Sequence, residues 1–286
     1  MGALKPKYEE LQSIYDISNE FFELFLGPTM GYTCGYYERD DMTTDEAQNA
    51  KFDLALGKLN LGPGMTLLDI GCGWGGAMQR ALEKYDVNVI GLTLSERQQE
   101  YAIAKLAKVP TTRNVEVRLQ GWEEFDEKVD RIVSIGAFEH FGHDRYDAFF
   151  NMAYDALPAD GSMLLHTITG VSLADGEELG LPMTFELARF AKFIMTEIFP
   201  GGRLPSVPMI EEKAAKAGFT VARVHMIGPH YVKTLQGWAQ ALEAHREEAI
   251  AVQSREVYDR YDKYLNGCVR LFREGYTNLG QFTLQK

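Results

Sequence analysis

The sequence predicts an α/β fold built on a parallel sheet. Short apolar segments typical of strands alternate with longer segments of helical periodicity, and this alternation produces parallel pairing through βαβ units. The stretch from Leu67 to Gly76, LLDIGCGWGG, is apolar, then acidic, then rich in glycine. This order is typical of a buried strand that ends in a tight turn before a helix, where a ligand can approach the main chain closely. We interpret this turn as a binding site for a nucleotide-like ligand.

The elements follow in order along the chain. Residues 8–26 are rich in aromatic and aliphatic side chains, and we expect them either to pack on the core or to cover an apolar ligand channel. Thr43 and Glu46 predict a capping box for a helix that runs to about Leu59, and Ser95 with Gln98 predicts another helix start. The expected strands cover residues 67–70, 87–92, 115–119, 129–135, 163–168, 219–227 and 282–285, with an antiparallel pair at the end.

Residues 170–210 interrupt the alternation with several prolines and glycines, and the pattern predicts a helix from Phe185 to Ile198. We interpret this segment as an inserted lid. Further on, five side chains are expected to share one helix face: Leu235, Trp238, Leu242, Ala249 and Val252. We therefore expect a single domain with a helical cap (1–60), a cofactor-binding core (61–169), the lid (170–210) and C-terminal strands and helices (211–286).

Composition narrows the class of protein. The 286 residues include 29 Lys and Arg against 41 Asp and Glu, a net charge of −12 that disfavours nucleic acid and anionic membranes as partners. Residues 1–10 lack an apolar signal core, and no apolar run reaches the roughly 18 residues of a membrane span, so we expect a cytoplasmic protein without stable membrane insertion. Cys34, Cys72 and Cys268 are too scattered for disulfides or zinc, which predicts free thiols and no metal.

The kind of nucleotide follows from the residues around the turn. The spacing Gly71-x-Gly73-x-x-Gly76 also fits dinucleotide-binding proteins, but Asp69 would repel an approaching pyrophosphate. The second strand also lacks the terminal acid that holds the ribose hydroxyls of a dinucleotide. S-adenosylmethionine, a cation without phosphate, therefore fits better.

Other side chains are expected at the same edge of the sheet. After the third strand, Trp122 can stack on adenine and Glu123 can accept from its amine, although a packed surface turn is the alternative. Glu139 follows the fourth strand among aromatic residues, where burial should raise its pKa. His166 ends the fifth strand and is either part of this crevice or a core histidine.

Several segments of the sequence together resemble a known family. The segments YTCGYYERDDMT, LLDIGCGWGG, GLTLSERQ, GWEEF, IVSIGAFEHFGHDRY, EIFPGGRLPS, HYVKTLQGWA, VYDRYDKYL and QFTLQK are similar, in order and spacing, to mycolic acid cyclopropane synthases and methyltransferases. The resemblance covers nearly the whole chain. It implies a Rossmann-like seven-stranded S-adenosylmethionine-dependent methyltransferase that acts on double bonds of very long acyl chains carried by acyl carrier protein.

The resemblance also implies a chemistry and its residues. Methyl transfer to the alkene gives a carbocation, and a bound bicarbonate removes a proton so that a cyclopropane closes. The resemblance implies that Glu139, His166 and Tyr231 hold the bicarbonate, together with the backbone of Cys34 and Ile135. The expected cofactor contacts are Tyr32, Thr33, Gly71, Gly73, Thr93, Gln98, Trp122 and Glu123, with Asp69, Cys72, Trp74 and Gly75 of the turn and Leu94. Cys268 matches a position often proposed as catalytic, but a thiolate would compete for the methyl group, so we expect a thiol that lines the channel.

The sequence departs from the family pattern at two positions, and several alternative functions remain. Thr33 stands where most relatives have serine, and Arg97 replaces a usual asparagine. The product could instead be a methyl branch beside a hydroxyl; a small-molecule O- or N-methyltransferase and a non-catalytic lipid-binding module are further alternatives. Because acyl carrier protein is acidic, we expect a local basic patch that includes Arg189, Lys192 and Arg203.

Overall fold

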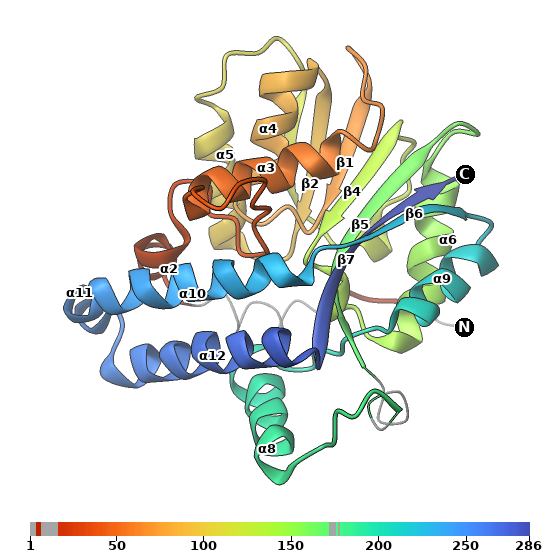
Figure 1. Cartoon of the computed structure of the whole chain (residues 1–286). Coiled ribbons are helices and arrows are strands. Elements are labelled where there is room, and N and C mark those ends of the chain that lie inside the picture. Colours follow the sequence, from red (N-terminus) through yellow and green to blue (C-terminus); the bar gives the residue numbers. More distant parts are fainter. Residues whose placement is uncertain (1–3, 7–16, 172–175, 177) are drawn as a thin grey trace.

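The fold is centred on one seven-stranded sheet. The computed structural model describes residues 4–6, 17–171, 176 and 178–286. Within them the strand order is β3-β2-β1-β4-β5-β7-β6, and the seven strands agree with the number that the family resemblance implied (Figure 1). The strands are β1 (Thr66–Ile70), β2 (Asn88–Thr93), β3 (Val115–Leu119), β4 (Arg131–Ile135), β5 (Ser162–Gly170), β6 (Thr220–Met226) and β7 (Thr277–Gln285). The first five are parallel, and β7 is antiparallel to both β5 and β6.

Helices cover both faces of this sheet. They are α2 (Asn19–Leu26), α3 (Thr44–Leu56), α4 (Gly76–Tyr85), α5 (Glu96–Leu106), α6 (Tyr146–Ala156), α8 (Phe185–Phe193), α9 (Val207–Lys216), α10 (Gly228–Ala244), α11 (Arg246–Val252) and α12 (Arg255–Glu274), with short turns η1 (Trp122–Glu124), η2 (Phe138–His140), η3 (His143–Arg145) and η4 (Ile194–Ile198). Successive strand residues point to opposite faces, so Leu67 packs with α3 and α4, whereas Leu68 packs in the cluster that contains α6 and α9.

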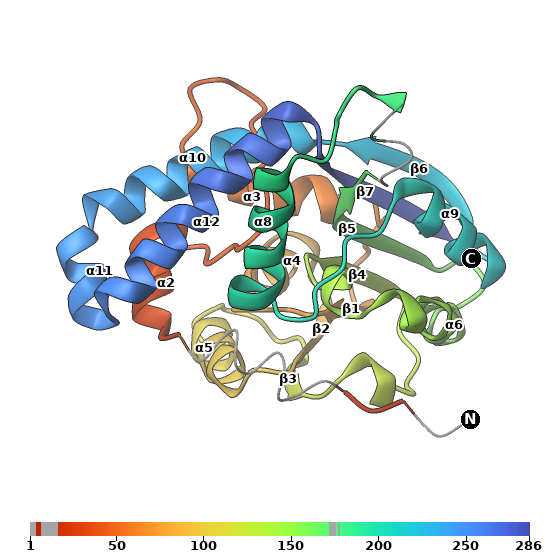
Figure 2. The same cartoon turned by 90° about the horizontal axis from the view of Figure 1, so that it is seen from below.

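A third apolar cluster lies beside the sheet rather than on it. Helices α10 and α12 run next to each other, α2 lies against α10, and α8 crosses below α12 (Figures 1 and 2). Phe21, Phe22 and Phe25 of α2 are buried there, so the described part of the N-terminal aromatic segment packs on the core. Residues 8–16 of that segment lie outside the described residues.

Local predictions are largely confirmed. The Thr43 side chain accepts from the Glu46 amide, and the Glu46 carboxylate accepts from the Thr43 amide at 2.7 Å, which completes the predicted capping box. Ser95 caps α5 by accepting from the Gln98 amide. The Gln98 side chain does not return to Ser95, because its amide oxygen accepts from the Thr93 hydroxyl instead.

Three expectations need correction. The helix predicted from Phe185 to Ile198 is α-helical only to Phe193, and its last turn is a π-helix. Val252 is 39% exposed, because the chain breaks between α10 and α11 at His245 and the helical phase is lost. The last strand begins at Thr277 rather than Phe282, since pairing with β5 continues to that residue. Of the described helices, none combines the length and apolarity needed to cross a bilayer.

Candidate active site

The glycine turn opens a cavity at the carboxyl end of the parallel strands. After β1 the Gly71 and Cys72 amides both donate to the Leu92 carbonyl, at 3.0 and 2.9 Å, which ties the turn to β2. Gly71 has a φ of +76°, and a Cβ there would lie 2.3 Å from the Ala137 side chain. A Cβ on Gly73 would meet nothing within 4 Å, so the backbone at Gly73 faces open space.

This cavity brings most of the predicted cofactor contacts together. It encloses about 1100 Å³, including solvent at its mouth. The predicted residues that line it are Tyr32, Thr33, Asp69, Gly71, Cys72, Gly73, Trp74, Thr93, Leu94, Gln98, Trp122, Glu123 and Ile135. Gly75 is not among the lining residues, because it caps α4 and its Cα faces Ala102 of α5.

Two carboxylates in the cavity fit an adenosine-containing cofactor. The Asp69 Oδ2 and Glu123 Oε2 atoms are buried, and neither has a hydrogen-bond partner within the described ranges. Glu123 is held by Arg145 at 2.6 Å, and the same guanidinium donates to the Lys5 carbonyl at 2.8 Å. A ribose or an adenine amine would supply the donors that these acceptors lack. The residues present therefore fit S-adenosylmethionine.

A buried lysine, which the sequence analysis missed, stands beside Asp69. The Lys51 ammonium donates to the Thr33 hydroxyl at 2.6 Å and lines the same cavity. Burial lowers the Lys51 pKa to about 7, while burial raises the Asp69 pKa to about 7 against the attraction of Lys51. A signal for Lys51 was available, because it lies four residues from both Ala47 and Ala55 on the buried face of α3.

Glu139 lies just beyond β4 in the turn η2. Its Oε1 accepts from the Ile168 amide at 2.7 Å, and its Oε2 is buried without a partner among the described residues. Burial raises the Glu139 pKa to about 7, although the Ile168 amide opposes this change. The Glu139 carbonyl also accepts from the Arg203 amide at 2.9 Å, which fastens the segment around Arg203 to the site.

His166 is fully buried in β5, opposite Ile135 of β4 and Gln281 of β7. Its Nδ1 lies 3.2 Å from the Gln281 amide nitrogen, while its Nε2 has no partner in the described structure. Burial lowers the His166 pKa well below its usual value, assisted by the positive charges of Lys51 and Lys58. His166 and Ile168 lie on the same face of β5, because side chains two residues apart in a strand point the same way.

Tyr231, Cys34 and Cys268 lie in the third apolar cluster. Tyr231 of α10 is buried, and its pKa is raised well above its usual value by burial and, to a smaller extent, by Tyr264, Cys34, Cys268 and Glu139. The structure thus brings these predicted residues within electrostatic reach of one another. Burial raises the pKa of both thiols, that of Cys268 to about 12, which disfavours a thiolate at either position. The described residues contain no group of three His, Cys, Asp or Glu side chains suited to a metal ion.

Comparison with known proteins identifies the family of the chain. The family model for mycolic acid cyclopropane synthetase matches residues 3–282. Cyclopropane mycolic acid synthase 1 of Mycobacterium tuberculosis is 62% identical over 283 residues, which is 99% of each chain.

Two solved structures superpose over the full length of both chains. The cyclopropane synthase MmaA2 from Mycobacterium tuberculosis has a TM-score of 0.98 at 58% identity. The mycolic acid cyclopropane synthase CmaA1, complexed with SAH and CTAB, has a TM-score of 0.97 at 62% identity. With its glycine turn, seven-stranded sheet and full-length similarity, the chain is an S-adenosylmethionine-dependent methyltransferase that belongs to the mycolic acid cyclopropane synthetase family.

Proposed function

We propose that the enzyme transfers a methyl group from S-adenosylmethionine to a double bond in a mycolic or other very long acyl chain and forms a cyclopropane. The observation that carries this proposal is a pair of buried polar atoms, Glu139 Oε2 and His166 Nε2, that lack partners in the described structure. Glu139 follows β4 and His166 lies in β5, next to the cavity of the glycine turn. Buried polar atoms of this kind are paired in native proteins, so each of these atoms is expected to contact a small polar ligand.

The cofactor supplies an electrophilic methyl group when it is bound. Its adenosine would be held by the carboxylates of Asp69 and Glu123 and by the neutral pair Thr93 and Gln98. Trp122 offers an aromatic surface in the same cavity. An alkene is a weak nucleophile, so it must be held near this methyl group in a dry environment. Tyr32 and Trp74 line the cavity and also belong to the third apolar cluster, which connects the cofactor site to an apolar region.

That apolar region suits both the acyl chain and a positive charge on carbon. Tyr32 packs against Phe199 and Trp238, and Phe199 packs edge-on against Tyr264, with ring centroids 5.6 to 6.2 Å apart. The negative faces of such rings stabilise a nearby cation. The solved relative CmaA1 is complexed with CTAB, an amphiphile with a long alkyl tail, which supports an apolar acyl site in this chain too.

The residues also fit a bicarbonate, which would supply a base for the proton that leaves the new methyl group. Ionised Glu139 can accept from the hydroxyl of bicarbonate, while the Tyr231 hydroxyl and an imidazole N–H can donate to its oxygens. In the balanced reaction the alkene gains one CH₂ group, and S-adenosylhomocysteine and one proton are released. Capture of the cation by water would instead add a methyl group and a hydroxyl.

We also propose that the acyl chain arrives on acyl carrier protein. Arg189, Lys192 and Arg203 are all exposed, and the Arg203 amide donates a hydrogen bond to the Glu139 carbonyl. An acidic carrier would be attracted to them. Charge reversal at Arg189 and Lys192 should weaken carrier binding while leaving affinity for S-adenosylmethionine unchanged, and intact carrier binding would refute this partner.

The decisive experiment incubates the purified protein with S-adenosylmethionine and an unsaturated long acyl chain. We expect release of S-adenosylhomocysteine together with a product that is heavier by one CH₂. This product should no longer take up hydrogen at the modified position, because the double bond there has been consumed. A product that contains an added hydroxyl would favour the methyl-branching alternative. Turnover of small amines or alcohols without turnover of the acyl chain would refute the proposal.

A further inference from the structure

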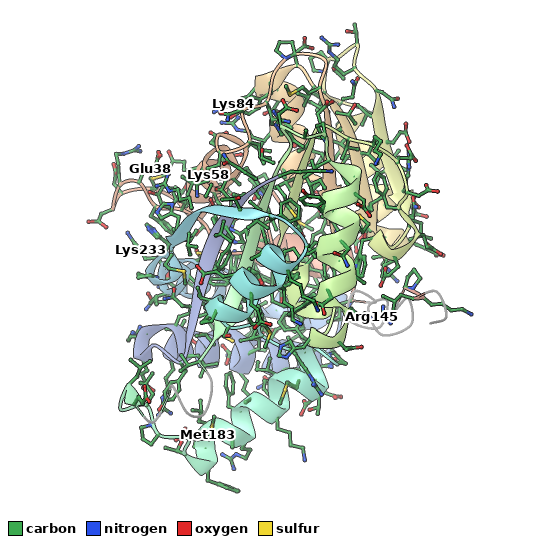
Figure 3. The ribbon with its side chains drawn as sticks, turned by 90° about the vertical axis from the view of Figure 1, so that its right-hand side faces the viewer. Glu38, Lys58, Lys84, Arg145, Met183 and Lys233 are labelled. Atoms are coloured by element: carbon green, nitrogen blue, oxygen red, sulfur yellow. The ribbon has the colours of Figure 1, made fainter. Side chains whose placement is uncertain are left out.

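A chain of three side chains connects the half-buried Lys58 to the buried His166. The Lys58 ammonium donates to the Gln281 Oε1 atom at 2.5 Å, and the Gln281 Nε2 atom lies 3.2 Å from His166 Nδ1. Gln281 is fully buried and pairs with His166 in the register of β5 and β7. In Figure 3, Lys58 lies along the left-hand side of the molecule, between Lys84 and Lys233.

The chemistry of these groups fixes the direction of each hydrogen bond. An ammonium has only donors, so the amide oxygen of Gln281 must face Lys58 and its NH₂ group must face His166. His166 Nδ1 must then accept a proton from this amide and cannot carry one itself. Because burial and the two nearby lysines keep the imidazole neutral, its single proton resides on Nε2.

We propose that Lys58, acting through Gln281, holds His166 in the tautomer that carries its proton on Nε2 and so presents an N–H donor to a small anion in the active site. Lys58 and Gln281 are therefore positioning residues, since neither touches the reacting atoms. The presence of an anion at His166 rests on the proposed function, whereas the His166 tautomer does not. The buried, unpartnered Nε2 atom is the second observation that points to a ligand.

Within the described residues, the Lys58 ammonium has one other hydrogen-bonding neighbour, which provides a control. Its ammonium lies 3.3 Å from His225 Nδ1 on β6, and His225 packs edge-on against Tyr36. Replacing His225 with phenylalanine removes this contact and leaves the Gln281 bond in place. We therefore expect His225→Phe to leave the His166 tautomer unchanged.

The test measures ¹⁵N chemical shifts of the imidazole nitrogens in the full chain labelled at histidine. The six histidines give separate signals, and the His166 signal is identified by its loss in His166→Asn. In the wild type we expect an unprotonated Nδ1 and a protonated Nε2. Gln281→Glu preserves the size of the side chain but places an acceptor beside Nδ1, so the proton should move to Nδ1.

Kinetics show whether the tautomer matters for the reaction. Lys58→Met and Gln281→Glu should each lower kcat about tenfold, with an unchanged KM for S-adenosylmethionine, whereas Lys58→Arg should restore kcat because a guanidinium also has only donors. Lys84→Met is the matched control, since Lys84 pairs with Asp53 on the surface of α4 and should leave kcat unchanged. Thermal unfolding of every variant checks that the fold is intact.

The outcomes separate this inference from the proposed function. A wild-type His166 protonated on Nδ1, or an unchanged tautomer in both Gln281→Glu and Lys58→Met, would overturn the inference. Added ¹³C-bicarbonate should shift the Nε2 signal of the wild type and not that of Gln281→Glu. Absence of that response in the wild type, with the proton on Nε2, would refute the bicarbonate site of the proposed function and leave the tautomer established.

Discussion

Glu139→Gln tests the proposed anion site because the structure dictates how the new amide must lie. The Ile168 amide donates to Glu139 Oε1 at 2.7 Å, so the oxygen of a glutamine would keep that place. Its NH₂ group would then occupy the position of Oε2, the buried atom that lacks a partner in the described structure. An acceptor for the bicarbonate hydroxyl thereby becomes a donor.

The size of the effect follows from the hydrogen bond that is lost. A hydrogen bond to a charged group contributes about 1.5–3 kcal/mol, which corresponds to a decrease in turnover of roughly 10- to 150-fold. We expect the affinity for S-adenosylmethionine, measured by calorimetry, to stay unchanged because Glu139 does not line the cofactor cavity. Turnover is measured as release of S-adenosylhomocysteine, and a rate equal to that of the wild type would remove Glu139 from the mechanism.

The same variant makes a prediction about stability and pH. Burial raises the Glu139 pKa from 4.5 to about 7, so the ionised carboxylate destabilises the folded state once the pH exceeds the unfolded pKa. At about 1.4 kcal/mol per pKa unit, the wild type should lose about 3 kcal/mol relative to Glu139→Gln as the pH rises from 4 to 8. Chemical unfolding at several pH values measures this difference, and a constant difference would show that Glu139 is not desolvated.

Three further variants test other parts of the site. Lys51→Met removes the donor to the Thr33 hydroxyl and should weaken binding of S-adenosylmethionine roughly tenfold in calorimetry, whereas Lys233→Met, at a surface ion pair with Asp40, should not. Gly71→Ala places a Cβ 2.3 Å from Ala137 and should destabilise the fold by more than about 2 kcal/mol beyond Gly180→Ala, which has a similar positive φ but open space; equal effects in denaturant unfolding would contradict the close approach. Arg145→Met frees Glu123 and should raise the KM for S-adenosylmethionine several-fold without lowering kcat, so an unchanged KM would show that the Arg145 ion pair does not shape the cofactor site (Figure 3).

The sequence was most informative where local chemistry determines structure. The glycine turn after β1 and the Thr43 capping box were predictable because a few neighbouring residues specify their backbone. The α10 to α11 region was less predictable, since a break at His245 leaves no strong local signal and places Val252 on the surface. The early start of β7 at Thr277 depends on pairing with β5, which local propensity cannot show.

The site was predictable only in part, for a similar reason. Residues of the turn and of the strand ends cluster because carboxyl ends of parallel strands meet at one edge. Gln281 and His166 are far apart in sequence and become neighbours only through the β5–β7 pairing, and Lys58, which follows α3, contacts Gln281 only in the folded chain. No spacing rule connects such residues, so their hydrogen bonds required the structure.

The place of β7 between β5 and β6 has a consequence for synthesis of the chain. Gln281 follows His166 by 115 residues, so a nascent polypeptide that has emerged from the ribosome through α10 already contains the glycine turn but leaves β5 as an unprotected edge. His166 acquires Gln281 as a neighbour only when β7 pairs with β5 and β6. Catalytic competence therefore waits until the sheet is complete.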